Sequence, residues 1–436
     1  MKNSTIKAVI LAAGKGTRMK SSLPKVLQTI FQKTLLEYVI DAVKRTEKVD
    51  EFFVIVGHQA EDVEKYTLEH CENTKCVLQS PQRGTGDAAA KVVPYLENFD
   101  GNVLIICGDT PLITSETLNK FFDAHITNNN DLTVVSAKFD DPTGYGRIVR
   151  GTDNKLSAIV EQKDADENTL KINEINAGIY LLNWAAVKDS FAQLKNNNAQ
   201  NEYYLTDIVR WSVDKNLKVD VFLIDNNEEI FGINSKKQLA QAGKILNQRK
   251  LDELMAEGVT IVDENTTFVS PDTTIGADTI VYPNTFINGK NVIGKNCKIG
   301  PNAHIRDGAI IGDNVRIGNF VEVKKSEIKS NTNVSHLSYI GDASLGSGVN
   351  IGAGTITANY NSISKVKSKT IIEDGVSIGS NTVLVAPVTM GKNSLTGAGT
   401  IITKDIPENA LGLTRAPLKI LADWYLKAKQ LVSKEK

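Results

Sequence analysis

NVIGKNCKIGPNAHIRDGAIIGDNVRIGNFVEVK, residues 291–324, decides the fold of the second half of this protein. Glycine follows four of the six aliphatic residues that occupy every sixth position, which are Ile293, Ile299, Ile305, Ile311, Ile317 and Val323. A period of six fits neither an α-helix nor a half-buried strand. It is typical of a three-sided parallel coil, in which each side is one six-residue unit, the aliphatic side chain points inward and glycine turns the corner.

The same period extends in both directions. It begins near Val269, slips by one residue on the way to Ile351, and resumes after a long excursion to end near Ile402. A phase kept over so many units predicts a parallel β-helix whose ends need covering. Arg306 and Lys324 occupy positions where the pattern expects glycine, and we expect function at such exceptions within a regular scaffold.

Composition limits the class of protein. A chain of 436 residues is too long for one ordinary core, which predicts two domains. A formal net charge of −1, with 50 basic and 51 acidic residues, gives no reason to expect a nucleic acid or a membrane as partner. The first residues, MKNSTIKAVI, carry no secretory pattern, no apolar run reaches membrane-spanning length, and the four cysteines lack metal-type spacing. We therefore expect a cytoplasmic protein with reduced thiols.

Apolar runs alternate with helical patterns in the first half of the chain. The strand KAVIL (7–11) precedes a loop of small residues and a helix from about 34 to 44, and the runs FFVIVG (52–57), CVLQS (76–80) and VLIICGDTP (103–111) follow. This alternation predicts a Rossmann-like α/β fold, a mostly parallel sheet with helices on both faces. Ligands of such sheets bind beyond the carboxyl ends of the strands, which is where LAAGKGTR, SPQRGTGDA and CGDTP fall.

Two of these loops have a chemical interpretation. The small residues of 12–18 allow backbone amides to approach a phosphate chain, which Lys15, Arg18 and Lys25 can neutralise. A tight strand-to-helix turn explains the loop equally well, because its spacing is neither the Walker pattern nor the dinucleotide fingerprint. Asp109 ends a buried strand, where a carboxylate can hold Mg²⁺ against phosphate oxygens; a helix N-cap or a turn aspartate is the alternative.

Longer motifs narrow these alternatives. LAAGKGTRM followed by LPKVL resembles the nucleotide-binding signature of sugar-1-phosphate nucleotidyltransferases, and QRGTGDA, GDTPL, DDPTGYGRIV, IVEQKDA, EINAGIY and NEYYLTD extend the match. With the predicted β-helix behind them, nearly the whole chain resembles the bifunctional N-acetylglucosamine-1-phosphate uridyltransferase and glucosamine-1-phosphate N-acetyltransferase family. The resemblance implies acetyl transfer from acetyl-CoA to glucosamine-1-phosphate in a left-handed β-helix. Mg²⁺-dependent uridylyl transfer from UTP to N-acetylglucosamine-1-phosphate, with release of pyrophosphate, would follow in the first domain.

The resemblance also assigns residues to the first site. For the uridine nucleotide it implies Leu11, Ala12, Ala13, Gly14, Gln82, Gly84, Thr85 and Asn234, with Lys25 on the phosphates. For the amino sugar it implies Gly146, Glu161 and Asn176, and for Mg²⁺ it implies Asp109 and Asn234. Ordinary surface polarity is the alternative for Glu161, Asn176 and Asn234. Attack on the α-phosphorus of UTP requires charge neutralisation and in-line positioning, which a metal ion and a lysine supply.

Two residues depart from the pattern of that family. Asp87 stands where histidine is expected in GTGHA, and Cys107 precedes Gly-Asp where tyrosine or serine is usual. The first is expected to alter a loop contact to the nucleotide, and the second removes a possible hydroxyl contact. Neither concerns Lys25 or the predicted metal ligands, so we expect changed affinity and retained chemistry.

The predicted β-helix carries the candidate acetyl-transfer site. His336 stands in SHLSYIGD, and the resemblance makes it the base that takes a proton from the sugar amine; a structural histidine is the alternative. Assigned to the acceptor sugar phosphate are Arg306, Lys324, Tyr339, Asn350 and one lysine of the excursion. Assigned to acetyl-CoA are Ala353, whose N–H would stabilise the oxyanion, Ser380, Ala398 and Arg415. Asn359 and Tyr360 are assigned to the sugar or to acetyl-CoA.

The excursion, residues 358–370, interrupts the coil where a binding loop would be useful. It is two residues longer than the family pattern, which leaves either Lys365 or Lys367 as the phosphate ligand. Asn361 replaces the usual aspartate there, and Asp307 replaces the proline expected after Arg306.

A helix is predicted between the two domains. Residues 235–257 contain one glycine and no proline, and their apolar residues recur every three to four positions. A helix of this length is about 35 Å long at 1.5 Å per residue. It is either a stiff spacer or a helix packed fully against the first domain. The predicted domains are therefore 1–234 and 258–436, joined by this linker.

The end of the chain predicts an amphipathic helix. Leu418, Leu421, Tyr425 and Leu431 share one side, and covering the last turn of the coil is the expected role. Similar proteins are trimers whose second site is shared between chains, so the resemblance implies a homotrimer. Two other functions are considered: a nucleotidyltransferase whose β-helix only assembles subunits, and a non-enzymatic nucleotide-sugar sensor.

Overall fold

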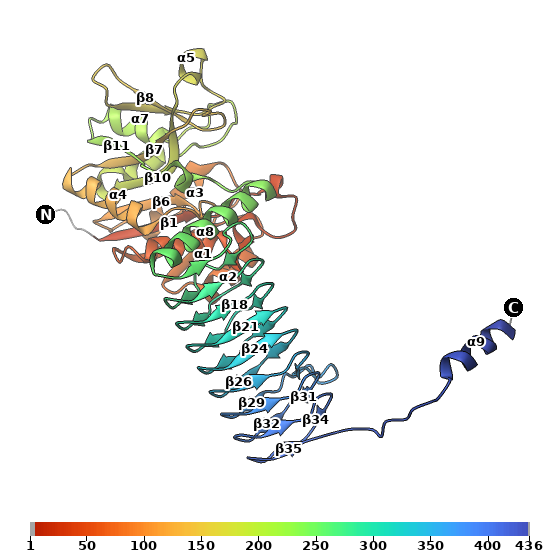
Figure 1. Cartoon of the computed structure of the whole chain (residues 1–436). Helices are drawn as coiled ribbons and strands as arrows, with labels where there is room; N and C mark the ends of the chain where they lie inside the picture. The colour runs from red at the N-terminus through yellow and green to blue at the C-terminus, as the bar shows by residue number, and fades with distance from the viewer. Residues whose placement is uncertain (1–4, 435–436) are drawn as a thin grey trace. The chain divides into compact units, whose positions relative to one another are not determined.

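The computed structural model describes residues 5–434 and divides into two compact units, Met1–Leu246 and Asn247–Lys436 (Figure 1). Each unit is described by itself. The division falls inside one helix, α8 (Lys236–Ala256), and the predicted domain boundaries stay a prediction. None of the helices within residues 5–434 combines the length and the apolar character that crossing a membrane requires.

One mixed sheet forms the centre of the first unit. Its main path runs through β11 (Val219–Leu223), β7 (Leu132–Lys138), β10 (Glu174–Asn183), β6 (Asn102–Cys107), β1 (Ile6–Leu11), β4 (Val49–Val56) and β5 (Thr74–Leu78). Off this path, β8 (Arg147–Arg150) pairs with β10 and with β9 (Leu156–Val160), and β2 (Thr29–Ile30) pairs with β3 (Lys33–Thr34). The strands β6, β1, β4 and β5 are parallel, whereas β10 is antiparallel to β6 and β7. The prediction of a mostly parallel sheet is therefore confirmed for β6, β1, β4 and β5, which include the three strands that precede the motif loops.

Helices cover both faces of this sheet, as predicted. One core contains residues of α1 (Leu35–Lys44), α2 (Ala60–His70) and α4 (Ser115–Thr127). The other contains residues of α3 (Thr85–Ala90), α6 (Trp184–Val187) and α7 (Asp207–Asp214), and the single turn α5 (Glu167–Leu170) contributes no buried residue. Because side chains alternate along a strand, neighbours such as Val9 and Ile10 belong to different cores.

Three parallel sheets form the faces of the coil in the second unit (Figure 1). The first face holds β12 (Thr260–Ile261), β15 (Ile280–Val281), β18 (Lys298–Ile299), β21 (Arg316–Asn319), β24 (Asn333–His336), β27 (Asn350–Ile351), β30 (Ser377–Ile378), β33 (Leu395–Thr396) and β35 (Leu411–Gly412). The second face holds β13 (Phe268–Val269), β16 (Phe286–Ile287), β19 (His304–Ile305), β22 (Glu322–Lys324), β25 (Tyr339–Gly341), β28 (Ile356–Ala358), β31 (Val383–Val385) and β34 (Ile401–Ile402). The third face holds β14 (Thr274–Ile275), β17 (Val292–Ile293), β20 (Ile310–Ile311), β23 (Glu327–Ile328), β26 (Ala343–Leu345), β29 (Thr370–Ile372) and β32 (Val388–Met390). The predicted parallel β-helix is therefore confirmed.

Its core is the predicted line of aliphatic side chains. Each of the six that define the period, from Ile293 to Val323, is at most 2% exposed. Glycine is needed at the corners because the backbone of the next coil passes directly over them. A Cβ added to Gly318 would lie 2.0 Å from the carbonyl oxygen of Ser335, and one added to Gly312 would lie 2.8 Å from the amide nitrogen of Ser330.

The coils do not all have the same length. Lys298 pairs with Arg316, and Arg316 pairs with Asn333, so the second of these steps is one residue shorter, as the sequence predicted. The excursion leaves the coil between β28 and β29, and an antiparallel bridge joins Tyr360 to Lys367 within it. The coil thus accommodates slips and one long insertion while the inward side chains keep their places.

Helix α8 belongs to both units. Its Ala242 and Leu246 are buried in a small core of the first unit, and Leu251 and Leu254 are buried in the core of the coil. The Asn247 amide donates to Thr267 O at 2.9 Å and accepts from the Val269 N–H at 2.9 Å, which ties it to the start of the coil. The single predicted helix is present, but it is neither a free spacer nor packed wholly on the first unit.

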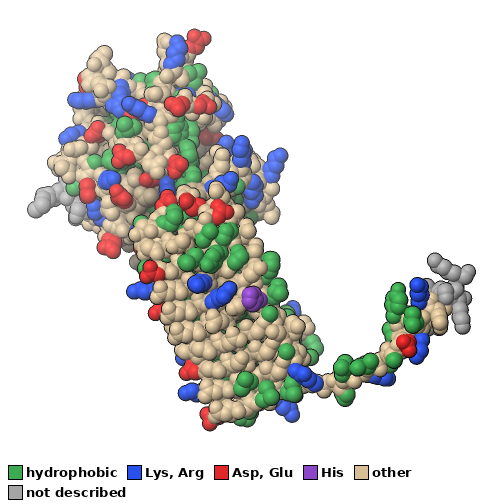
Figure 2. All heavy atoms as spheres, in the orientation of Figure 1, with side chains coloured by type: hydrophobic (Ala, Val, Ile, Leu, Met, Phe, Trp, Pro, Cys, Tyr) green, Lys and Arg blue, Asp and Glu red, His purple; other side chains and the backbone are tan. Residues whose placement is uncertain are grey.

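The expected cover of the last coil is not observed. After β35 the chain continues to α9 (Trp424–Lys434), which starts later than the amphipathic pattern suggested (Figure 1). The apolar side chains that should cover the coil are exposed, by 87% at Leu418, 53% at Leu421 and 75% at Tyr425, and the side chain of Leu431 lies outside the described residues. Leu418 and Leu421 precede α9, so they do not share a helical face with Tyr425, and Figure 2 shows apolar side chains exposed along this described part of the chain.

The corner geometry predicts the cost of one methyl group. Gly318→Ala should lower the free energy of unfolding by about 3 kcal/mol, because the added carbon overlaps backbone that cannot move alone. Gly348→Ala is the matched control, since its added carbon meets nothing within 4 Å and only the φ of +68° opposes it. That control should cost about 1 kcal/mol, and urea unfolding followed by circular dichroism measures both. Equal losses would contradict the close approach at Gly318.

Candidate active sites

A pocket of about 420 Å³ opens at the carboxyl ends of β1 and β6 in the first unit. It brings together the predicted nucleotide residues Leu11, Ala12, Ala13, Gly14, Lys25, Gln82, Gly84 and Thr85 with the predicted metal ligand Asp109. Gln79 and Glu202 also line it, and sequence reasoning missed both. Gln79 directly follows the carboxyl end of β5 and precedes the SPQRGTGDA motif, which is the signal that could have identified it.

Glycine permits the tight approaches around this pocket. Gly16 has a φ of +59°, and an added Cβ would lie 2.7 Å from the Cβ of Lys25. Gly84 has a φ of +113°, and an added Cβ would lie 2.5 Å from Tyr203 O. Larger residues would therefore displace Lys25 and the segment that carries Thr85. The loop after β1 is a tight turn and also lines the pocket. The two interpretations given to it, a tight turn and a phosphate-binding loop, are therefore compatible.

Asp109 and Asn234 point their oxygens at one cation. The Lys25 ammonium donates to Asp109 Oδ2 and, at 3.2 Å, to Asn234 Oδ1. The Ile233 N–H donates to the backbone oxygen of Asp109 at 2.9 Å, which joins the two distant segments. Mg²⁺ prefers hard oxygen ligands and keeps several waters and phosphate oxygens, so two protein oxygens that converge in this way fit such an ion.

A buried carboxylate fastens these segments further. Glu229, which precedes Asn234 in the chain, accepts from the Thr114 N–H and hydroxyl, both at 2.9 Å, and from the Thr117 hydroxyl at 3.0 Å. Thr114 caps the start of α4, the helix that follows the Asp109 loop. The relative position of the two predicted metal ligands therefore depends on a network outside the pocket.

The three residues assigned to the amino sugar lie together. The Asn176 N–H donates to Gly146 O at 2.9 Å, and a Cβ added to Gly146 would lie 3.5 Å from Glu161 Oε2. Burial raises the pKa of Glu161, a hydrogen bond from Thr206 opposes that shift, and neighbouring carboxylates such as Asp164 add to it. Asn176 and Glu161 can offer amide and carboxylate groups to a sugar on this side of the unit.

Asp87 and Cys107, the two residues that depart from the family pattern, both lie at or beside this pocket. Asp87 is 6% exposed and faces Gln79 from the first turn of α3. Cys107 lines the pocket, and burial, followed by the nearby Asp109 carboxylate, raises the pKa of its thiol to about 12. The thiol is therefore neutral near pH 7 and offers the pocket a weakly polar wall where a hydroxyl would have offered a hydrogen bond.

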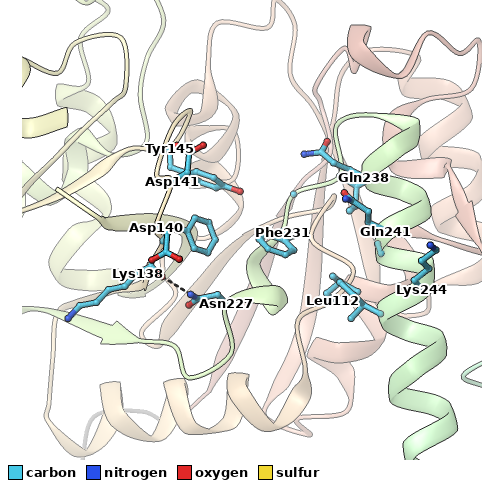
Figure 3. A pocket seen from close by; sticks show the side chains of 15 residues that line it. Leu112, Lys138, Asp140, Asp141, Tyr145, Asn227, Phe231, Gln238, Gln241 and Lys244 are labelled. Atoms are coloured by element: carbon cyan, nitrogen blue, oxygen red, sulfur yellow. Dashed lines mark hydrogen bonds between the residues drawn. The ribbon is translucent and has the colours of Figure 1, made fainter. Parts of the chain in front are cut away.

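A larger hollow of about 800 Å³ lies elsewhere in the first unit (Figure 3). Its lining includes the side chains of Tyr145 and Phe231, and a 2.6 Å hydrogen bond from Asn227 to the backbone oxygen of Lys138 closes one side. Gly232 also lines it, and a Cβ added there would lie 3.9 Å from Asp109 Oδ2. The hollow thus lies beside Asp109, a predicted metal ligand, although the predicted nucleotide residues line the smaller pocket.

In the second unit, four predicted residues occupy equivalent corners of successive coils. Continuing the strand register past β24, β27, β30 and β33 stacks His336, Ala353, Ser380 and Ala398 along the edge between the first and second faces. Backbone bonds of 2.7 Å, from Asn381 to Ala353 O and from Gly399 to Ser380 O, join three of these corners. We call this row the histidine edge.

The histidine edge is open to a ligand. The side chains of His336, Ser380 and Ala398 are exposed, and within the described residues the Ala353 N–H donates no hydrogen bond. A Cβ added to Gly397 would lie 3.7 Å from a guanidinium nitrogen of Arg415, which puts that cation beside Ala398. No acidic or carbonyl group of residues 5–434 bonds the His336 ring, so these residues do not fix the orientation of the ring.

The cations assigned to the sugar phosphate lie on another edge, between the second and third faces. Register pairs the corner of Arg306 with that of Lys324, and an ion pair of 2.9 Å joins Arg306 to Glu322. The Lys367 ammonium, then the Arg306 guanidinium and burial, lower the pKa of Lys324, so three cations gather there. We call this group the cation edge.

The remaining assigned residues lie beside the cation edge, on the excursion or, for Asn350, on the first face. The Asn359 amide donates to Asp342 and lies 3.5 Å from the Tyr339 hydroxyl, which curls over Gly341. Asn350 is exposed on the first face, and Tyr360 and Lys365 are exposed on the excursion. Gly341 is five residues further along the chain than His336, so at about 3.3 Å per residue the two edges of one chain lie at most about 17 Å apart.

Known proteins resemble the chain over almost its full length. A nucleotidyl transferase family model matches residues 7–228, a bacterial transferase hexapeptide model matches 292–325, and a model of the hexapeptide repeat of succinyl-transferase matches 369–404. A bifunctional protein GlmU of Synechococcus sp. is 43% identical over 95% of this chain and 98% of its own. Proteins of the same name from Thermosipho africanus and Shouchella clausii are 43% and 42% identical over 97% and 96% of this chain, and each is covered by 98%. The hexapeptide matches assign the coil to the left-handed class, as expected.

The raised pKa of Glu161 predicts a pH-dependent stability. Ionising this half-buried carboxylate costs folding free energy at pH values above its folded pKa, and the cost vanishes once the pH falls below its unfolded pKa. Glu161→Gln should therefore unfold at a higher urea concentration than the unmodified protein at pH 7.5, with the difference closing near pH 4. Asp153→Asn, at a carboxylate with 59% side-chain exposure, is the control. A difference independent of pH would contradict the assignment.

Proposed function

The chain belongs to the GlmU family of bifunctional proteins, and from that premise we propose how its two sites share the synthesis of UDP-N-acetylglucosamine. It is a transferase with two activities, acetyl transfer to glucosamine-1-phosphate and uridylyl transfer to the acetylated product. The observation that carries this conclusion is the match of whole bifunctional relatives, which includes both the nucleotidyltransferase unit and the hexapeptide coil. A coil that served only for assembly would not need polar groups gathered along two edges.

For acetyl transfer, we propose that acetyl-CoA lies along the histidine edge. As the nitrogen of the sugar amine attacks the thioester carbon, a ring nitrogen of His336 takes the proton that the amine nitrogen loses. The C–N bond forms, the Ala353 N–H donates to the developing oxyanion, and the C–S bond breaks with release of the CoA thiolate. The exposed ring of His336 and the unengaged Ala353 N–H support these two roles.

The cation edge is proposed to hold the phosphate of glucosamine-1-phosphate. Arg306 can bind it through a planar fork, and Lys324 and Lys367 add positive charge beside it. The lowered pKa of Lys324 supports this role, because a bound phosphate would relieve the repulsion among the three cations. The position of Lys367 beside Lys324 favours it over Lys365 as the lysine that the sequence left undecided.

For uridylyl transfer, we propose that the sugar phosphate attacks the α-phosphorus of UTP in line with the departing pyrophosphate. The Pα–O bond to the β-phosphate breaks, and Lys25 neutralises charge on the phosphates. Glu161 and Asn176 hold the sugar. Mg²⁺ bound by Asp109 and Asn234 would supply further neutralisation, and the convergence of their oxygens on one cation supports this assignment.

We also propose a homotrimer in which the acetyl-transfer site lies between neighbouring chains. The histidine edge and the cation edge lie on opposite sides of one face, so two adjacent copies can bring one edge of each together. His336 would also find its orienting partner there. The exposed apolar side chains from Leu418 to Leu426 support assembly, because isolated chains rarely leave so many neighbouring apolar groups in water.

The two activities should be separable by mutation. Asp109→Ala should lower pyrophosphate release from UTP and N-acetylglucosamine-1-phosphate about 100-fold, with CoA release changed less than about twofold. His336→Ala should lower CoA release about 1,000-fold and leave pyrophosphate release intact when the acetylated sugar is supplied. Normal CoA release by the His336→Ala protein would favour the coil as an assembly scaffold.

The choice between the two excursion lysines has a direct test. Lys367→Gln should lower kcat/KM for glucosamine-1-phosphate in acetyl transfer about 30-fold, because a phosphate loses one charged donor. Lys365→Gln is the matched control and should change the same constant less than about threefold. A larger loss in the Lys365→Gln protein would reverse the assignment.

A further inference from the structure

A buried carboxylate beside the nucleotide pocket has no role in the mechanism above. Asp87 is 6% exposed and accepts hydrogen bonds from Gln79 at 2.8 Å and Arg83 at 2.9 Å, with the Lys91 ammonium 3.3 Å away. Burial raises the pKa of Asp87, but the hydrogen bonds from Gln79 and Arg83 and the charge of Lys91 outweigh that effect and hold it below its usual range. The group is therefore an ionised acceptor that cannot donate near pH 7.

The orientation of the Gln79 amide follows from this acceptor. Gln79 Nε2 donates to Gly84 O at 3.0 Å and to Asp87 Oδ2 at 2.8 Å. Both partners can only accept, so both N–H bonds of the amide are used and the reverse orientation would set oxygen against oxygen. Gln79 is 3% exposed, lines the pocket, and its Oε1 accepts no hydrogen bond from the described residues. The side chain can offer a nucleotide an acceptor and nothing else.

An acceptor alone distinguishes the pyrimidine bases. The uracil of UTP has one N–H, at N3, because N1 is bonded to ribose, and cytosine has a lone pair at the same place. We propose that Asp87 is a positioning residue that fixes Gln79 Oε1 toward N3 and so makes the pocket select uracil over cytosine. This inference rests on the proposed function, since it takes UTP as the substrate of this pocket.

The role of Asp87 is separable from holding the segment in place. The Gly86 N–H donates to Tyr203 O and the Tyr203 N–H donates to Arg83 O, both at 2.8 Å. The Arg83 guanidinium also lies 5.3 Å from the centre of the Tyr203 ring. The backbone around Gly84 is therefore secured without Asp87. What Asp87 adds is the second acceptor that opposes rotation of the Gln79 amide.

The test is the ratio of kcat/KM for UTP to kcat/KM for CTP, measured by pyrophosphate release with N-acetylglucosamine-1-phosphate. Asp87→Leu removes the acceptor and should lower this ratio about tenfold, because the amide can then turn an N–H toward cytosine. Asp87→Asn keeps one acceptor oxygen of the same size and should retain more of the ratio than Asp87→Leu. Calorimetric binding of UTP and CTP should show the same order without turnover.

A double-mutant cycle separates positioning from general damage. Gln79→Ala should lower the ratio by itself, and adding Asp87→Leu should lower it no further, because Asp87 acts through Gln79. Asp41→Leu, at an acid that pairs with Lys33 away from the pocket, is the matched control and should leave the ratio unchanged. Urea unfolding followed by circular dichroism reports that the first unit of each variant is folded, and Asp87→Ala takes the place of Asp87→Leu if the leucine prevents folding.

Two results would overturn the inference. One is an unchanged UTP-to-CTP ratio in a folded Asp87→Leu or Asp87→Ala protein, and the other is a loss of ratio that is fully additive with Gln79→Ala. Failure of the proposed function would look different, because the unmodified protein would then release no pyrophosphate from UTP and no ratio would exist.

Discussion

Close contact between the backbones of successive coils is the constraint on which the second unit depends. Successive coils can stack closely only where each corner leaves room for the backbone of the next coil. At Gly312 and Gly318 that room would not admit a Cβ. Corners after the second face are different, because Asn288, Arg306 and Lys324 follow its strands. Arg306 and Lys324 can stand at these corners because the backbone leaves room for a side chain there, so the packing rule that builds the scaffold also limits where a binding edge can exist.

Much of this fold could be predicted because its cause is local and repeated. The six-residue period places Ile293 and its successors in the core irrespective of any distant contact, and the structure buries them as expected. Alternating apolar runs in the first half likewise predicted a sheet with two covered faces. The C-terminal helix was wrong in its role, because an amphipathic pattern identifies an apolar face without naming what covers it. Exposed Leu418 and Tyr425 show that the missing information is tertiary or quaternary.

In the candidate sites, too, the sequence predicted what depends on local pattern and missed what depends on tertiary contacts. Family motifs located Lys25 and Asp109, since loops after parallel strands meet at one end of a sheet. They did not locate Gln79, whose importance lies in three-dimensional contacts to Gly84 and Asp87. Nor could they choose between the two excursion lysines, because the choice depends on how the backbone folds back between Tyr360 and Lys367. Spacing in the sequence is informative where the backbone is regular and loses its meaning in a loop.

The corner positions along the histidine edge are spaced at regular distances. Neighbouring strands of a sheet are about 4.8 Å apart, so the three steps from His336 to Ala398 span about 14 Å, in fixed increments that no side-chain rotation can alter. The length available to a ligand stretched along that edge is set by the hydrogen-bonded spacing of the strands. Inserting or deleting one whole turn of the coil would lengthen or shorten the histidine edge by one strand spacing and leave the other hydrophobic layers intact. Related proteins could in this way bind acyl carriers of different length.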